Sequence, residues 1–273
     1  MKVLLCAISK NDEEYILEWV NHYLSIGITH IIIYNNSIVD NYSDILKQYI
    51  NDNLVTVDNC VLNKEFINKE KNFNAQTYVY TKCYNENYMN YDFICFFDMD
   101  EFIEFENKRT NIISFLHNKN FDKFNVIRLC WKIYDDNNII VPKTFSVNQF
   151  LTPSKNTYQN RVCKSILRTN IDMKNKKISA HGVYNILSCD ALGNLCWNKE
   201  GHDNIFIGEK PILHKCWLNH YRYKTIYEYI NKMKLMNESN LSEYTLDYFF
   251  TYNEKTPEKL EYIKSLGIDY EYK

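Results

Sequence analysis

Two aspartates with one residue between them, Asp98 and Asp100, followed at once by Glu101, carry the strongest chemical signal in this sequence. They come directly after residues 93–97, an apolar run with the length of a buried strand. Residues at i and i+2 of an extended chain point to the same side, so both aspartates are expected to flank one spot. Mn²⁺ and Mg²⁺ prefer oxygen ligands and often keep water and substrate phosphates in their shell. The pair therefore predicts a site for a divalent cation and a diphosphate.

The same acidic residues have a plainer interpretation. An Asp-x-Asp pattern arises by chance about once in a chain of this length, and acidic side chains at a strand end are often only solvated surface. Position favours the site, because the pattern follows the fourth strand of an alternating strand–helix series and is bracketed by aromatic residues.

The elements that must position these carboxylates alternate along the first hundred residues. The predicted strands cover residues 3–8, 30–34, 54–57 and 93–97. The predicted helices cover the segment between Asp12 and the stop at Gly27, residues around 43–50, and residues 74–88. This alternation indicates βαβ units and a parallel sheet, in which a ligand sits beyond the carboxyl ends of the strands. The polar groups that close the four strands (9–11, 35–36, 58–59 and 98–101) are therefore expected along one edge.

The pattern is less regular after residue 106. A helix is predicted over 110–116, a strand over 126–134 and a last helix over 226–233, and residues 140–215 mix short strands with loops.

Composition limits the class of protein. The chain has 273 residues, of which 45% are hydrophobic and 24% charged, with a net charge of -2; these values exclude a disordered or fibrous protein and give no general attraction to nucleic acid. The nine cysteines form no CxxC pair, which argues against a zinc ribbon or a disulfide framework and for reduced thiols.

No targeting or membrane segment is expected. The apolar run over residues 3–8 is too short for a signal peptide, and no run approaches 18 apolar residues. These features predict a cytoplasmic protein with no integral membrane segment.

Several segments resemble, in order and spacing, the GT-A-type glycosyltransferases related to families 2 and 92. They are residues 10–13, 17–31 and 34–37 with Asp40, the segment 97–103 that resembles a DxDEF metal motif, residues 164–168 with His181, and His220-Tyr221 with Lys224-Thr225, which resembles an HY..KS box. Together they span most of residues 1–235. The resemblance implies a GT-A (Rossmann-like) α/β fold with a mostly parallel central sheet flanked by helices and a less regular C-terminal acceptor region. It implies one domain over 1–273, with a nucleotide-sugar-binding half (1–106), an acceptor region with the C-terminal motif (107–235) and a helical tail (236–273).

The resemblance also implies a donor site. Lys10, Asn11, Asn35 and Asp40 would surround the base and ribose of a nucleotide-sugar, with uridine as the expected base. Asn35 stands where relatives usually carry an acidic residue. Gln76, in the helix before the acidic residues, is similar to a polar contact to the donor.

For the metal and the leaving group, the resemblance implies that Asp98 and Asp100 bridge to the diphosphate through Mn²⁺ or Mg²⁺, with Asp100 the more direct ligand. Glu101 would support the loop or touch the sugar. His220 would complete the metal or phosphate site, and Lys224 would neutralise the leaving diphosphate.

The implied activity is a hexosyltransferase-like transfer of a sugar from a UDP-sugar to a hydroxyl of a glycan or protein. No motif identifies a catalytic base, although Glu200 and Asp203 lie in a polar loop. One alternative is a nucleotidyl or phosphoryl transferase on a similar fold, which the lack of a Walker-type loop disfavours in its P-loop form. Another is an inactive nucleotide-sugar-binding protein, against which the four intact residues Asp98, Asp100, His220 and Lys224 argue.

Overall fold

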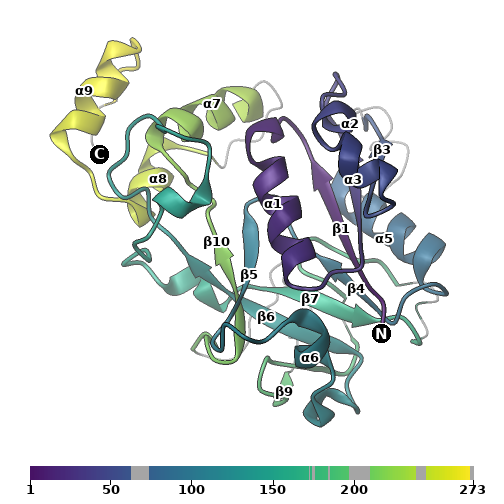
Figure 1. The fold of residues 1–273 in the computed structure, drawn as a ribbon. Coiled ribbons are helices and arrows are strands. Elements are labelled where there is room, and N and C mark those ends of the chain that lie inside the picture. Colours follow the sequence, from purple (N-terminus) through teal and green to yellow (C-terminus); the bar gives the residue numbers. More distant parts are fainter. Residues whose placement is uncertain are drawn as a thin grey trace. The chain divides into compact units, whose positions relative to one another are not determined.

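The protein was analysed as a computed structural model that describes residues 1–62, 74–171, 173, 176–183, 185–196, 210–237 and 244–270 (Figure 1). The strands are β1 (Val3–Ser9), β2 (His30–Asn35), β3 (Val55–Asn59), β4 (Phe93–Phe96), β5 (Glu101–Phe105), β6 (Val126–Ile133), β7 (Cys163–Arg168), β8 (Ser188–Cys189), β9 (Leu195–Cys196) and β10 (Cys216–His220). The α-helices are α1 (Glu13–Ser25), α2 (Tyr42–Ile45), α3 (Lys47–Asn51), α5 (Ala75–Asn87), α6 (Ile112–Leu116), α7 (Ile226–Asn237), α8 (Leu246–Tyr252) and α9 (Pro257–Ser265).

The sheet runs in the order β3-β2-β1-β4-β7-β6-β10-β5. Its first four strands are parallel, as the alternating pattern predicts, and β7 then pairs antiparallel with β4. Ser9 of β1 is level with Asn35 of β2, which is level with Asn59 of β3. The predicted polar edge at the carboxyl ends of these strands is therefore confirmed.

Helices α1 and α5 lie on either side of β1 in Figure 1. Helix α5 packs Val79, Tyr80 and Cys83 against alternate residues of the strands, Leu4 and Cys6 among them, because alternate side chains of a strand face the same side. Helix α1 buries one stripe at helical spacing, which comprises Tyr15, Ile16, Trp19, Val20 and Tyr23. The sheet is thereby covered by helices, and its carboxyl edge is left to polar residues.

One predicted helix is wrong in detail. Residues 43–50 form two short helices, α2 and α3, which meet at Leu46. Leu46 is buried and its backbone has φ -99° and ψ 11°, outside the helical region. The regular spacing of residues 43–50 gives no sign of this break.

The chain divides into two compact units, residues 1–131 with 160–218 and residues 132–159 with 219–273. The predicted single domain, with functional parts that meet at residues 106 and 235, stays a prediction. All nine cysteines are free. No helix among the described residues has both the length and the apolar character needed to cross a bilayer.

Gly182 lies against β7 in the first unit. Its φ is +120°, and a Cβ there would lie 2.1 Å from the Ser165 hydroxyl oxygen, which itself donates to the His181 carbonyl. We expect Gly182→Ala to lower the free energy of unfolding by at least about 2 kcal/mol in urea titrations. Gly267→Ala is the matched control, because Gly267 has φ +70° but no atom within 4 Å of the added carbon. Equal losses in both variants would contradict the packing argument.

Candidate active site

The acidic residues form a closed turn between β4 and β5. The Asp98 backbone N–H donates to Oε2 of Glu101 at 2.8 Å, and the Glu101 N–H donates to the Asp98 carbonyl at 3.1 Å. Glu101 is completely buried. The expectation that Glu101 supports this loop is confirmed.

Two buried side chains of helix α1 hydrogen-bond the backbone of the same turn. The indole N–H of Trp19 donates to the carbonyls of Asp98 (3.0 Å) and Glu101 (3.1 Å), and the Tyr23 hydroxyl donates to the Glu101 carbonyl at 2.9 Å. Trp19 lies in the predicted helix before Gly27 and in the resemblance segment 17–31, and neither pattern distinguishes a tryptophan that binds a turn from one that only packs. The turn is therefore fixed by groups about 80 residues away along the chain.

A buried lysine lies against the turn. Nζ of Lys164 is 2.7 Å from Oδ2 of Asp98 and 3.6 Å from Oε2 of Glu101, and its side chain is only 1% exposed. Strand β7 brings it there, because Ser165 is level with Phe96 in the antiparallel pair. Lys164 lies in the resemblance segment 164–168, which implied no role for it.

The other oxygen of Asp98 is also occupied. Oδ1 accepts from the side-chain amide of Gln76 at 2.5 Å and from the Tyr80 hydroxyl at 3.1 Å, and both donors come from α5. The Asp98 side chain is 33% exposed, so one part of it still faces solvent. The structure thus brings Gln76 and Asp98 together, as two of the predicted donor residues.

Burial and neighbouring charges shift the pKa values of Glu101 and Lys164. Burial raises the pKa of Glu101 well above its ordinary value, against the opposing effect of Lys164. Burial by itself would lower the pKa of Lys164, but Asp98 and Glu101 raise it above its ordinary value. The lysine is therefore cationic, and Asp98 is its principal anionic partner.

The predicted base and ribose residues fall into two kinds. Asn35 is buried, donates to Asn59 at 2.9 Å and accepts from the Ser37 N–H at 2.9 Å. The carboxylate of Asp40 accepts from two backbone N–H groups at the start of α2, from the Ser43 hydroxyl and from Asn59. These two residues shape the edge of the site.

Lys10 and Asn11 are exposed at the end of β1. Asn11 has φ 59°, a left-handed conformation that asparagine tolerates better than most residues. Its N–H donates to the Ser37 hydroxyl at 2.9 Å. Their side chains are accessible to a ligand at the carboxyl edge.

A comparison with known protein families shows to which family the chain belongs. The model for glycosyltransferase family 92 matches residues 3–188, more than half of the chain. The chain belongs to glycosyltransferase family 92. This family agrees with the resemblance stated from the sequence. The comparison with curated proteins gives no match.

Three solved structures of S. aureus TarS are similar to this family 92 chain. TarS 1–349 has 17% identity over 62% of this chain and 47% of its own, with a TM-score of 0.38. A longer TarS structure has 18% identity over 62% and 28%, with a TM-score of 0.37, and TarS 1–349 in complex with UDP has 17% over 62% and 47%, with a TM-score of 0.37. The chain spans less than half the length of each.

His220 and Lys224 belong to the second unit of this family 92 chain, so their part in the donor site stays a prediction. His220 is buried at the end of β10, and Lys224 has φ 51°. The next residue, Thr225, hydrogen-bonds Glu228 through its hydroxyl (2.7 Å) and its N–H (3.1 Å) at the start of α7. The hydroxyl in this box therefore begins a helix, and the Thr-x-x-Glu spacing would have indicated this.

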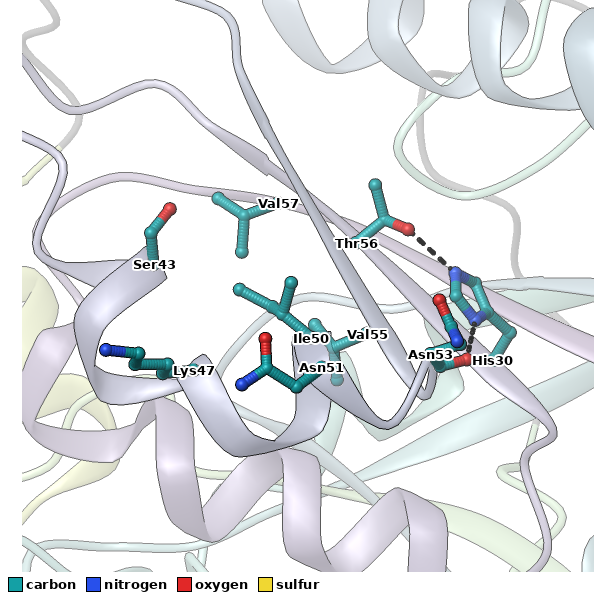
Figure 2. A pocket seen from close by; sticks show the side chains of 9 residues that line it. All are labelled: His30, Ser43, Lys47, Ile50, Asn51, Asn53, Val55, Thr56 and Val57. Carbon is teal, nitrogen blue, oxygen red and sulfur yellow. Dashed lines mark hydrogen bonds between the residues drawn. The ribbon is translucent and has the colours of Figure 1, made fainter.

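The first unit also contains a cavity of about 340 Å³, which lies away from the acidic turn (Figure 2). It is lined by His30, Ser43, Lys47, Ile50, Asn51, Asn53, Val55, Thr56 and Val57. The His30 ring is hydrogen-bonded to the Asn53 carbonyl (3.0 Å) and the Thr56 hydroxyl (2.9 Å). His30 and Val55 begin β2 and β3, so the cavity extends toward the amino ends of the strands and is not the candidate site.

No group of three or more His, Cys, Asp and Glu side chains within the described ranges is arranged to hold a metal ion. Both oxygens of Asp98 already accept hydrogen bonds from protein donors. Glu200 and Asp203, the acidic residues of the polar loop, lie outside the described residues.

Proposed function

We propose that this protein transfers a sugar from a nucleotide-sugar, with UDP-sugars as the expected donors, to a hydroxyl of a glycan or protein. The single observation that supports this most strongly is the rigid acidic turn, residues 98–101, at the carboxyl edge of the parallel strands. That edge is where α/β sheets bind ligands, and the uridine preference follows from the family resemblance.

The residues of the first unit would act mainly by positioning. Trp19 and Glu101 fix the backbone of the turn, and Gln76 with Lys164 fixes the carboxylate of Asp98. A group that is already held in place needs no reorganisation when the leaving diphosphate gains negative charge. We assign no catalytic base.

Mn²⁺ or Mg²⁺ would be held at this turn by only one or two protein carboxylates. Such ions commonly use one or two carboxylates and take their remaining ligands from water and substrate phosphates, so a site without a cage of three protein ligands fits them. Asp100 would be the more direct protein ligand, as the family resemblance implies. Bound there, the ion would supply positive charge to the departing diphosphate.

The direct test is release of free nucleoside diphosphate from a panel of nucleotide-sugars with a mixed glycan and protein acceptor panel. We expect release from a UDP-sugar in the presence of Mn²⁺, and at least about a hundredfold loss in excess EDTA that added Mn²⁺ reverses. Undiminished activity in EDTA would contradict metal dependence. Donor binding without any turnover would favour the inactive binding protein, and release of pyrophosphate from a nucleoside triphosphate would favour the nucleotidyl transferase.

A further inference from the structure

The buried Lys164 faces the acidic turn from the protein interior. Its Nζ is 2.7 Å from Asp98 and 3.6 Å from Glu101. Its side chain is 1% exposed, whereas that of Asp98 is 33% exposed. A ligand on the solvent side would therefore meet Asp98, and Lys164 can act on that ligand only through Asp98 and through its charge.

Stability alone does not account for a charged group at this position. Removing a lysine from water is costly, and apolar side chains of similar volume often replace a buried ion pair with no loss of stability. Asp98 is also held on its other oxygen by Gln76 and Tyr80, so its orientation has support besides the lysine. What only Lys164 adds within this hydrogen-bonded group is positive charge.

That charge matters for the ligand that the proposed function requires. Asp98, Asp100 and Glu101 place three carboxyl groups within four residues, and a diphosphate is repelled by each one that is ionised. We infer that Lys164 is a positioning residue that neutralises Asp98 from the buried side, which allows a nucleoside diphosphate to approach the acidic turn. The inference rests on the proposed function and extends it to a residue without an assigned role.

The test is isothermal titration of UDP in EDTA, and separately of Mn²⁺ without nucleotide. In Lys164→Met we expect the Kd for UDP to rise about tenfold or more, because the turn gains one net negative charge. We expect Mn²⁺ to bind at least as tightly as in wild type, because the same change attracts a cation. Lys164→Arg keeps the charge and is expected to stay within about threefold of wild type for UDP. Local unfolding would weaken both ligands together.

Two further variants distinguish an effect of Lys164→Met on folding from its effect on charge. Asp98→Asn/Lys164→Met has the net charge of wild type and is expected to regain at least about threefold in UDP affinity over Lys164→Met. If the single variant does not fold, the UDP affinity of this double variant relative to wild type tests the role of Lys164. Lys259→Met removes a lysine that is buried as completely and pairs with Asp136 in the other unit, and we expect it to leave both Kd values unchanged.

The outcomes separate this inference from the proposed function. Unchanged UDP affinity in Lys164→Met, or parallel losses of UDP and Mn²⁺, overturns the role of Lys164 while the proposed function stands. Wild-type protein that binds no UDP with or without Mn²⁺ overturns both.

Discussion

Asp100→Asn is expected to lower kcat/KM for sugar transfer by about 10³-fold or more, because it removes the carboxylate proposed to hold the cation beside the leaving diphosphate. The fold should be unaffected, since the turn is closed by Asp98 and Glu101 and held by Trp19. The measurements are steady-state kinetics with the donor found in the panel and the thermal midpoint of unfolding.

Asp52→Asn is the matched control for this variant. Asp52 is an exposed aspartate at the end of α3, before β3, and therefore lies at the amino end of the strands. We expect wild-type kinetics from it. Near wild-type transfer by Asp100→Asn at saturating Mn²⁺ would exclude Asp100 as the main metal ligand.

Lys164→Met is expected to lower the free energy of unfolding at pH 7 by about 2 kcal/mol, less than the usual cost for a fully buried ion pair, because the Asp98 side chain left behind is 33% exposed. Asp98→Asn/Lys164→Met should cost much less than the sum of its two single variants, because no uncompensated charge remains and Glu101, whose pKa is raised by burial, can keep its proton. Urea denaturation of the wild type and the three variants gives the coupling energy, expected at about 2 kcal/mol. Additive losses would mean that the two charges do not depend on each other.

Local sequence patterns were sufficient for the first four strands, β1 to β4, and for the edge that carries the site, but not for β5, β7 and β10. The runs that became β1 and β2 are continuously apolar because both faces of a parallel sheet are covered, and such runs are visible without a structure. The break at Leu46 was not visible, because helical spacing continues through it.

The acidic turn, with its Asp-x-Asp-Glu spacing, was determined by the sequence itself, and so was its place after a parallel strand. The tertiary structure alone decided what holds the turn: Trp19, Tyr80 and Lys164 reach Asp98 or its backbone across 18 to 79 residues of chain. The physical reason is that periodicity records which side chains are buried but not which polar atoms they meet there. A lysine within a buried strand and a tryptophan on the buried face of a helix therefore gave no sign of their partners until the sheet was assembled.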